Sequence, residues 1–432
     1  MGGAGALLIP GHIQRSGVRR GSGAVLCAVL LAAALTACGG HDSDSAGAHR
    51  PATVAGEQQR SAPLPVPRGK GSKLPSDFNG DGAPDLVLDD LAHDGLGDDP
   101  GIGVVYGRKG HGLVAGTRQL LTPAKYAARI KGQAPATFAS EASCDLDRDG
   151  YADLVVSTDP PYDGQGMPPV PLQILFGSPT GISGKGVTLK IPARARFGNE
   201  WPDQPVCGDF DGDGRNDLVV HASAGRLSVL PGPFTRAGAP RGTTGIAQPG
   251  GNVPTGPAAD LNGDGTDDVL VRAHTGTARS AVALGGPNGF TKGATYPAGT
   301  DAVFGRFGAA ILGETGLKLY APGGRATRTV RVTGDRLAAA DLNGDGRDEL
   351  AVSDASDGVH LIGPGKPRRA PVKGRVIAVA DYDGDGRDDL ALQHTKGTTG
   401  ATDTVTVLTG NRTATLVSDT PQLTFSTTEF SN

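Results

Sequence analysis

The sequence predicts an all-β protein, built as a seven-bladed β-propeller. Glycine contributes 69 and proline 32 of the 432 residues, a composition typical of many turns and little helix. Short β-branched stretches alternate with Gly- and Pro-rich turns and show no helical periodicity. An acidic motif recurs at intervals long enough for one four-stranded sheet per copy. Together these observations favour a ring of small antiparallel sheets.

Residues 1–37 have the pattern of an export signal. A basic region with three arginines precedes an apolar run over residues 24–35, which is too short to span a membrane as a helix. The run ends in LTACG at residues 35–39, which resembles the cleavage site of a bacterial lipoprotein. The resemblance implies cleavage before Cys38, a diacylglycerol on its thiol, and anchoring to the outer side of the cell membrane. The alternative is an ordinary secretory peptide with a chance cysteine.

Residues 38–72 are expected to form a disordered tether, and residues 73–428 the propeller. The tether is rich in Gly, Ser, Ala, Pro and charged residues and has no apolar periodicity. Aromatic residues make up only 4% of the chain, so the core must be built from Val, Leu, Ile and Ala. A formal net charge of -4 gives no case for nucleic-acid binding. We expect a monomer held at the membrane by its lipid.

The acidic motif is present six times. The first copy, DFNGDGAPDLVL, has Asp or Asn at positions 1, 3 and 5, an acid at position 9, and an apolar stretch after it. The distance from the copy at Asp260 to the next acidic copy, at Asp341, is about twice the shortest distance between copies. Between them, residues 303–324 resemble the sequence that flanks the motif in other units but lack its acidic residues. We therefore count seven units, of which the fifth is degenerate. The six acidic copies begin at Asp77, Asp145, Asp209, Asp260, Asp341 and Asp381.

Each unit predicts four strands. A short apolar stretch leads into the acidic loop, a β-branched stretch follows it, and a Gly-flanked strand and a fourth stretch complete the unit. A single sheet of this size cannot bury both faces, whereas in a closed ring each blade covers its neighbour. The acidic loops join first to second strands and therefore lie on one face of the ring. The loops that join second to third strands, and those that join one blade to the next, lie on the opposite face.

The repeats resemble those of the FG-GAP (or VCBS) family, which includes the propellers of integrin α subunits. The resemblance spans residues 73–425, and residues 196–220 show a Phe-Gly pair and the acidic loop in one stretch. It implies a seven-bladed propeller with calcium in the acidic loops. The fifth unit departs from the family pattern, so no metal is expected there. The first three units are longer than usual and carry insertions in their loops.

The acidic loop has the ligand pattern of a calcium site. A hard cation takes six to eight oxygens, which side chains at positions 1, 3, 5 and 9 and the carbonyl at position 7 can supply, while Gly at position 6 permits the bend. A metal-free Asn/Asp-Gly turn is the alternative, but it needs two such residues rather than four. We expect up to six Ca²⁺ ions. The expected ligands are Asp77, Asn79, Asp81, Ala83 and Asp85; Asp145, Asp147, Asp149, Tyr151 and Asp153; Asp209, Asp211, Asp213, Arg215 and Asp217; Asp260, Asn262, Asp264, Thr266 and Asp268; Asp341, Asn343, Asp345, Arg347 and Glu349; and Asp381, Asp383, Asp385, Arg387 and Asp389.

Two cysteines lie on the innermost strands of neighbouring blades. Cys144 directly precedes the second acidic loop, and Cys207 lies two residues before the third. A disulfide is permitted outside the cytoplasm. The two offsets differ by one residue, so the spacing leaves open a disulfide or two buried thiols.

The face opposite the acidic loops is the candidate ligand face. It carries the insertions near Tyr162 and near Trp201, the only tryptophan. In integrin-like propellers this face engages ligands, so the resemblance implies recognition there, and an exposed aromatic ring suits a sugar or a protein anchor. The alternative is that Trp201 fills space between blades. We expect a surface-anchored, calcium-stabilised binding module for a protein or carbohydrate ligand.

The sequence gives no sign of an enzyme. Gly-x-Ser-x-Gly, His-Glu-x-x-His and phosphate-loop motifs are absent from it. The alternative function is a polysaccharide hydrolase or lyase on a propeller scaffold. Such an enzyme would need a carboxylate pair on the ligand face, for example Asp98 or Asp99 with Asp159 or Asp163.

Overall fold

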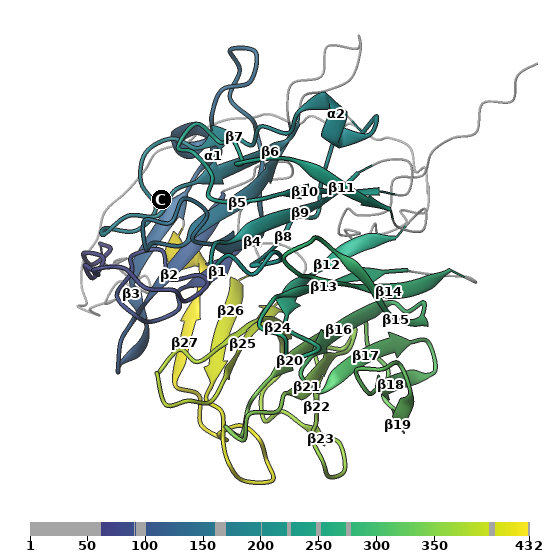
Figure 1. Ribbon diagram of the computed structural model, residues 1–432. Helices are drawn as coiled ribbons and strands as arrows, with labels where there is room; N and C mark the ends of the chain where they lie inside the picture. The colour runs from purple at the N-terminus through teal and green to yellow at the C-terminus, as the bar shows by residue number, and fades with distance from the viewer. Residues whose placement is uncertain are drawn as a thin grey trace, which may run out of the picture. The chain divides into compact units, whose positions relative to one another are not determined.

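The computed structural model describes residues 62–89, 91, 101–159, 170–199, 201–222, 226–247, 252–273, 278–396 and 402–430. These residues form seven antiparallel sheets that follow one another in chain order around a hub (Figure 1). The predicted seven-bladed β-propeller is confirmed, and the degenerate fifth unit forms a blade of its own. The predicted signal peptide and Cys38 lie outside the described residues.

In the described part of the chain, six blades have four strands each, and the first strands of successive blades contact one another around the hub. They are blade 2 (β4 Phe138–Cys144, β5 Asp153–Thr158, β6 Leu172–Leu175, β7 Val187–Thr188), blade 3 (β8 Val206–Gly208, β9 Asp217–His221, β10 Arg226–Leu230, β11 Thr244–Ala247), blade 4 (β12 Val253–Ala259, β13 Asp268–Arg272, β14 Arg279–Leu284, β15 Thr291–Pro297), blade 5 (β16 Asp301–Gly305, β17 Gly308–Gly313, β18 Gly316–Tyr320, β19 Ala326–Val330), blade 6 (β20 Arg336–Ala340, β21 Glu349–Ser353, β22 Val359–Ile362, β23 Arg368–Arg369) and blade 7 (β24 Arg375–Ala380, β25 Asp389–Lys396, β26 Thr402–Leu408, β27 Leu423–Ser426).

Blade 1 has only three strands among the described residues, so the prediction of four strands in every unit is wrong here. The strands are β1 (Leu86–Leu88), β2 (Ile102–Arg108) and β3 (Gly112–Leu121). β1 follows the acidic loop and corresponds to the second strand of the other blades. The residues before the loop include Pro75, which has no N–H to donate, and Ser76, whose φ of 61° lies in the left-handed region. Neither residue suits a regular hub strand.

Residues 62–72, which composition assigned to the tether, lie against blades 1 and 2. Leu64 donates its N–H to the carbonyl of Gly116 in the edge strand β3, at 2.7 Å. Ser72 donates its N–H to the second acidic loop, also at 2.7 Å. The folded part therefore begins before residue 73, because this segment pairs with backbone groups of a sheet edge and of the loops.

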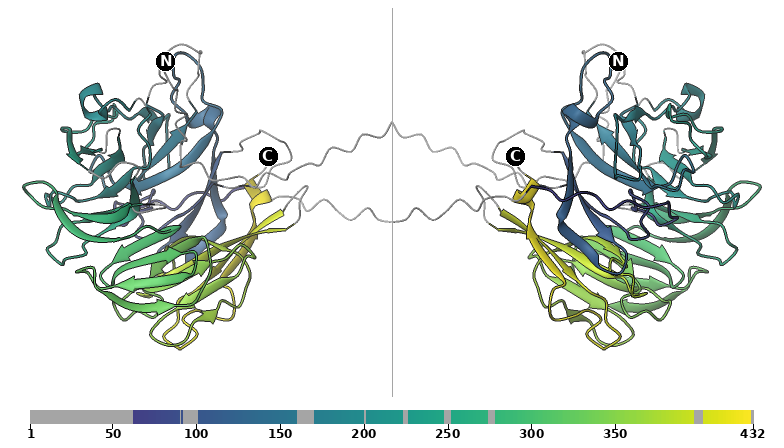
Figure 2. Two further views of the ribbon diagram at one scale, coloured as in Figure 1. Left: turned by 90° about the vertical axis from the view of Figure 1, so that its right-hand side faces the viewer. Right: turned by 90° about the vertical axis from the view of Figure 1, so that its left-hand side faces the viewer.

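The ring closes where blade 7 meets blade 1. Leu86 and Val105 of blade 1 share one buried core with Tyr382 and Phe425 of blade 7. Figures 1 and 2 show the yellow strands of blade 7 beside the blue strands of blade 1. Each of the other contacts between neighbouring blades is also built mainly from Val, Leu, Ile and Ala, as the composition predicted.

A 3-10 helix, η1 (Thr427–Phe430), extends this closure beyond the predicted boundary at residue 428. Phe430 is buried in the core shared by blades 1 and 7. Arg118 of β3 donates its Nε–H to the Glu429 carbonyl at 3.0 Å and pairs with the Glu429 carboxylate at 3.4 Å. The propeller therefore includes these residues.

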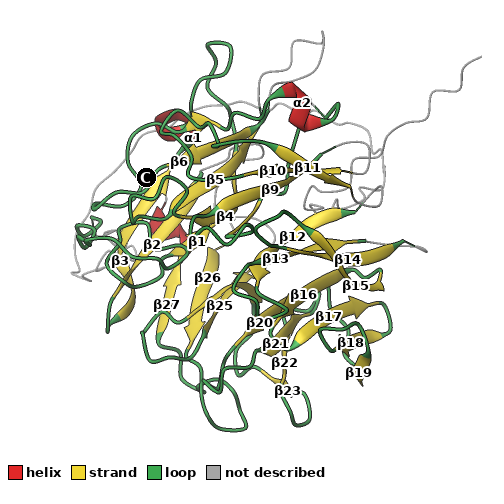
Figure 3. Cartoon of the chain, viewed as in Figure 1, coloured by secondary structure: helices red, strands yellow, loops and turns green. Residues whose placement is uncertain are grey.

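Helices are a minor part of the described structure. The two α-helices, α1 (Pro123–Tyr126) and α2 (Ala193–Arg196), have four residues each and lie in loops outside the sheets (Figure 3). Within the described ranges, no helix has the length and apolar character needed to cross a membrane.

Candidate metal loops and the opposite face

The acidic loops lie where the sequence places them. In blades 2, 3, 4, 6 and 7 the loop joins the first strand to the second, so these loops share one face of the ring. In blade 1 the loop leads directly into β1. In blade 5 a tight turn between β16 and β17 takes the place of the loop and carries no acid.

The carboxylate at position 1 closes every acidic loop on itself. In the second loop, Asp145 accepts the N–H of Asp149 at 3.1 Å and the N–H of Gly150 at 2.9 Å. The same two bonds, from positions 5 and 6 to position 1, are present in all six loops. The glycine at position 6 of every acidic loop adopts a positive φ, for example 89° at Gly150, which explains the requirement for glycine there.

The carboxylate at position 9 is buried and joins the loop to the third strand. Asp153 accepts the N–H of Leu146 at 3.0 Å and the N–H of Gly177, which follows β6, at 3.0 Å. The same pair of bonds is made in all five loops with aspartate at this position. The sequence predicted a metal ligand at position 9, and the structure gives this residue a second role as a fixed acceptor for two backbone donors.

The acidic loop of blade 6, which begins at Asp341, has the longer acid Glu349 at position 9. Its Oε1 accepts the Asn343 side-chain N–H at 2.6 Å, whereas its Oε2 is buried without a hydrogen-bond partner. A buried carboxylate oxygen without a donor is costly unless a cation or a proton satisfies it. This oxygen is therefore available to a metal ion.

Burial raises the pKa of the carboxyls at position 9. The pKa rises to about 7 for Asp217, Glu349 and Asp389, and to about 6 for Asp268. Neighbouring carboxylates of the same loop add to the rise, for example Asp211 beside Asp217. Without a cation, these groups hold protons near neutral pH because their charges are desolvated and repel one another.

Three of the six loops gather their carboxylates tightly enough to hold a metal ion. Among the described residues, one oxygen from each of three acids lies within 4.8 Å of the others in these sets: Asp145, Asp147 and Asp153; Asp209, Asp211 and Asp217; and Asp381, Asp383 and Asp385. The other three loops have asparagine at position 3. There the amide donates to a nearby oxygen, as Asn262 does to Asp264 at 2.8 Å.

Arginine side chains also contact the clustered acids. Arg236 pairs with Asp147 and Asp149 of the second loop, and its guanidinium lies 4.4 Å from the centre of the Phe176 ring. Arg241, on the same connection after β10, pairs with the third loop through Asp211 at 3.0 Å and through Asp213 at 2.9 Å. Positive charge therefore sits against the oxygens expected to bind a cation. The oxygen-rich donor sets fit a hard divalent cation.

Two pairs of loops in neighbouring blades are linked by hydrogen bonds that were not predicted from the sequence. Asp267, at position 8 of the fourth loop, accepts the N–H of Asp209 at 2.9 Å and donates its own N–H to the Asp209 carbonyl at 2.9 Å. Asp388 makes the same pair of contacts with Asp341. Desolvation raises the pKa of Asp267 and of Asp388. An acid at position 8 of the motif, present in three of the six copies, is the sequence feature that could have indicated these contacts.

The match to a family model falls on the third and fourth of these repeats. Residues 209–271 match the model described as FG-GAP-like repeat. This part of the seven-bladed β-propeller is an FG-GAP-like repeat. The resemblance drawn from the acidic motif is thereby confirmed, together with the seven-bladed fold.

The chain matches no curated protein. It is similar to solved structures at low identity, of which two are described here. The first is BBS1N in complex with ARL6DN, at 14% identity and a TM-score of 0.45, covering 81% of this chain and 95% of that chain. The second is PorZ, a surface component of the type-IX secretion system of Porphyromonas gingivalis, at 12% identity and a TM-score of 0.40, covering 84% of this chain and 38% of that chain.

A disulfide joins the hub strands of blades 2 and 3. Cys144 at the end of β4 and Cys207 in β8 are bonded, with their Cα atoms 6.5 Å apart. The sequence left a disulfide and two thiols open, and the structure has the disulfide. It lies beside the core shared by these blades, near Leu146 and Leu218.

The opposite face of the propeller carries the predicted ligand residues only in part. Trp201 is 38% exposed and therefore does not fill a space between blades. Tyr162, Asp98, Asp99 and Asp163 lie outside the described residues. Asp159, proposed as half of a catalytic pair, accepts the N–H groups of Ala136 and Thr137 at 2.8 and 2.9 Å. This position gives it a local structural role.

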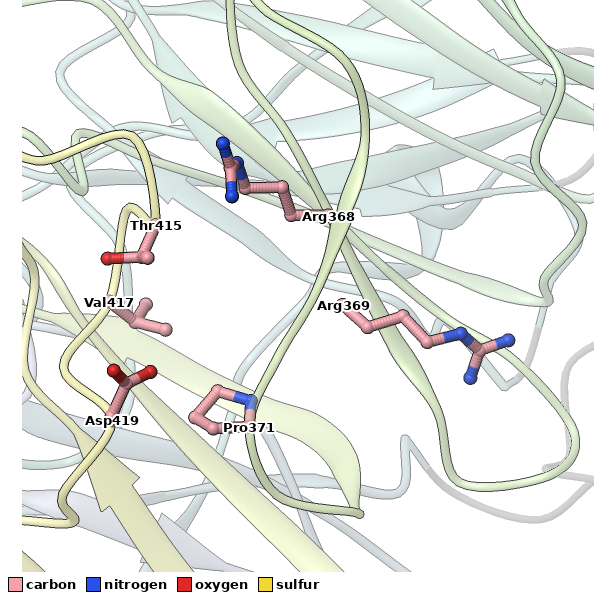
Figure 4. A pocket seen from close by; sticks show the side chains of 6 residues that line it. All are labelled: Arg368, Arg369, Pro371, Thr415, Val417 and Asp419. Atoms are coloured by element: carbon pink, nitrogen blue, oxygen red, sulfur yellow. The ribbon is translucent and has the colours of Figure 1, made fainter.

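The pockets of the described part of the propeller include the following two. One, of about 220 Å³, lies at the hub on the side away from the acidic loops, lined by Glu141, Gln204, Pro205, Val206, Val253, Pro254, Thr255, Gly256 and Arg272. The other, of about 250 Å³, lies between the outer parts of blades 6 and 7 and is lined by Arg368, Arg369, Pro371, Thr415, Val417 and Asp419. In Figure 4 the Arg369 side chain points away from this second space. It has no aromatic wall and no buried acid.

Proposed function

We propose that the protein is an exported, calcium-stabilised binding module whose face opposite the acidic loops recognises a protein or a carbohydrate. The observation that carries the proposal is the division of the propeller into two faces. One face holds six acidic loops that are tied to each other and to the sheets. The other holds the irregular connections, the hub cavity and the exposed ring of Trp201.

Calcium is the proposed ion of the acidic loops. The side chains at positions 1, 3, 5 and 9 and the position-7 carbonyl would hold it, as in the set Asp209, Asp211, Asp213, Arg215 and Asp217. When bound, Ca²⁺ supplies charge that offsets the repulsion between these carboxylates, in the flexible oxygen geometry that it favours. The buried Oε2 of Glu349 and the clustered aspartates support this assignment.

Export and anchoring through Cys38 form the second part of the proposal. The basic, apolar and Cys-containing pattern at residues 1–39 is the main support. The disulfide between Cys144 and Cys207 adds to it, because such bonds persist mainly outside the reducing cytoplasm. The lipid would hold the propeller at the outer side of the membrane.

Binding without catalysis is the third part. Among the described residues of the opposite face, Asp159 accepts hydrogen bonds from backbone N–H groups, and Asp203 lies 3.1 Å from Nδ1 of His221. These contacts give both carboxylates a local structural role, which supports the proposal. Trp201 offers an exposed ring on a Pro- and Asp-containing loop, a surface suited to a sugar ring or to a protein anchor.

A capture experiment tests the proposal. The mature lipidated protein in detergent is applied to a glycan array and to extracellular protein extracts, with Ca²⁺ and with EDTA. We expect specific capture that needs Ca²⁺ and is lost in Trp201→Ala but kept in Leu74→Ala, which removes another exposed apolar side chain. Release of shortened glycan would overturn the assignment as a binding module in favour of a hydrolase or lyase.

A further inference from the structure

The hub cavity is an open, polar pocket lined by residues of three successive blades. Its wall includes Glu141 of β4, Val206 of β8 and Thr255 of β12, and its volume is about 220 Å³. These three residues come from the first strands of blades 2, 3 and 4, so the cavity lies beside the hub. Neither Trp201 nor any residue of the acidic loops lines it.

Glu141 is a half-buried acid without a cationic partner in the described part of the chain. Its carboxyl bonds to Ser157, and burial raises its pKa to about 7. Asp89 and Asp203 add to this rise through their negative charges. Both of these acids have partners of their own, since Asp89 accepts from Ser140 at 2.7 and 2.6 Å and Asp203 pairs with His221.

Gln204 contributes a second oxygen to the same cavity. Its Oε1 is buried and has no hydrogen-bond partner. Its backbone has a φ of 52°, in the left-handed region that costs energy for a residue with a side chain. Strain of this kind and a buried acceptor without a donor are both unfavourable in isolation. A ligand that donates hydrogen bonds would compensate for the second of them.

Arg272 lies on the same wall but its charge is already engaged. It donates to the Thr300 carbonyl at 2.6 Å and lies 3.9 Å from the carboxylate of Asp301. The wall itself holds one acid, Glu141, and one base, Arg272, and the nearby carboxylates of Asp89 and Asp203 add negative charge around Glu141. This balance favours a cation as the occupant.

The number of oxygens decides between a metal ion and an organic cation. The acid clusters able to hold a metal among the described residues do not include Glu141. One carboxylate and one amide oxygen are too few for a hard divalent ion, which takes six or more oxygens. They match the needs of an ammonium group, which donates three hydrogen bonds and carries one charge.

We propose that the hub cavity binds a primary ammonium group, with Glu141 as its counter-ion and Gln204 Oε1 as an additional acceptor. The group comes either from a small free amine or from a lysine side chain of a protein ligand. The inference rests on the proposed binding role of this face, but its test does not require the macromolecular ligand to be known.

Carbon-13 NMR of the glutamate carboxyls tests the proposal directly, because the chain has only six glutamates. The full mature protein, loaded with Ca²⁺, is titrated with n-butylamine, n-butanol and butyrate. We expect a saturable shift of the Glu141 signal with n-butylamine alone, and loss of that response in Glu141→Gln. Glu314→Gln, which makes the same change at an exposed site, should keep it.

Thermal melting separates loss of the site from loss of the fold. Glu141→Gln should melt at or above the wild-type temperature, because it removes a partly desolvated charge, and n-butylamine should no longer raise its melting temperature. Gln204→Leu should weaken n-butylamine binding several-fold. No response of Glu141 to n-butylamine, or an equal response to n-butanol, would overturn the proposal whether or not the face captures a macromolecule.

A second arm identifies the source of the ammonium group. N-acetyl-lysine amide and N-acetyl-norleucine amide differ only in the charged group at the end of the side chain. Binding of the lysine compound assigns the cavity to a lysine of a protein ligand. Binding of n-butylamine together with exclusion of the lysine compound assigns it to a small free amine, and both results support the ammonium site.

Discussion

Asp267 and Asp209 exchange two hydrogen bonds across the boundary between blades 4 and 3. The Asp267 carboxylate accepts the Asp209 N–H at 2.9 Å, and the Asp267 N–H reaches the Asp209 carbonyl at 2.9 Å. Asp209 also opens the third acidic loop. The residues expected to bind metal are therefore part of the structure that holds neighbouring blades together.

Replacement of Asp267 by alanine should lower the free energy of unfolding by about 1–3 kcal/mol. The change leaves the N–H of Asp209 without its acceptor in a partly buried position. Urea unfolding monitored by circular dichroism, in the presence of Ca²⁺, gives the value. Asp419→Ala, at an exposed position, is the matched control. Equal stability of the two variants would show that the interblade contact does not contribute.

Removal of calcium should lower the melting temperature of the propeller. A site whose Kd lies a hundredfold below the free Ca²⁺ concentration stabilises the folded state by roughly 2.7 kcal/mol, and several such sites act together. Calorimetry with Ca²⁺ and with EDTA measures the shift, and Mg²⁺ serves as the comparison ion. Identical melting with Ca²⁺ and EDTA would contradict the assignment of the loops.

Calcium uptake should release protons near neutral pH. Burial raises the pKa of Asp217, Glu349 and Asp389 to about 7, above the values of the unfolded chain, so the metal-free folded protein binds more protons than the unfolded one. The free energy of unfolding of the EDTA-treated protein should therefore fall as the pH rises from 5 through 7. Bound Ca²⁺ requires the charged carboxylates, so its affinity should fall as the pH drops below about 7.

Calorimetric titrations in two buffers of different ionisation enthalpy measure this proton release. A Glu349→Gln variant should release fewer protons than the wild type, because one shifted carboxyl is missing. Calcium binding without proton exchange at pH 7 would show that these carboxyls are already charged in the metal-free protein.

Replacement of Arg236 by alanine should raise the affinity of the second loop for calcium by about two- to fivefold, the scale of an exposed ion pair. Its guanidinium pairs with Asp147 and Asp149, which are also expected ligands, so the two cations compete. Terbium luminescence titration detects the change. Arg375→Ala removes an arginine that pairs with Asp335 at 2.7 Å, away from the loops, and should leave affinity unchanged. Weaker binding in Arg236→Ala would mean that the arginine supports the loop.

Loss of the disulfide should destabilise the propeller by about 2–4 kcal/mol. Cys144 and Cys207 are 63 residues apart in sequence, so their bond restricts a long segment of the unfolded chain. The Cys144→Ser/Cys207→Ser double variant and the reduced wild type should show similar losses in urea unfolding. A loss in the reduced protein alone would point to an effect of the reductant.

The repeated motif made the fold predictable because each copy carries its own strand signal and its own turn. Asp153, for example, is followed at once by the apolar residues of β5, so the loop and the strand are read together. The same reasoning predicted the degenerate unit from residues 303–324, and the structure has blade 5 at residues 301–330. The expected first strand of blade 1 is not formed, because the residues before Asp77 lack the apolar stretch present in other units.

The repeated motif could not predict contacts between segments that are far apart in the sequence. Asp153 accepts the N–H of Gly177, 24 residues away, and this bond depends on where the third strand ends. Arg236 reaches the second loop from a connection in the next blade. Gln204 carried no sequence signal, since an amide between Asp203 and Pro205 looks like any loop residue. Only the assembled ring brings these groups together.

The seam between blades 7 and 1 has a consequence for biogenesis. Phe425, Glu429 and Phe430 complete the seam, and no strand is exchanged across it. Until residue 430 has been made, blade 1 keeps an apolar flank uncovered, however well the intervening blades have formed. The ring of blades therefore closes only after residues 425–430 have been synthesised. A chain halted before Phe425 should be a substrate for chaperones and proteases.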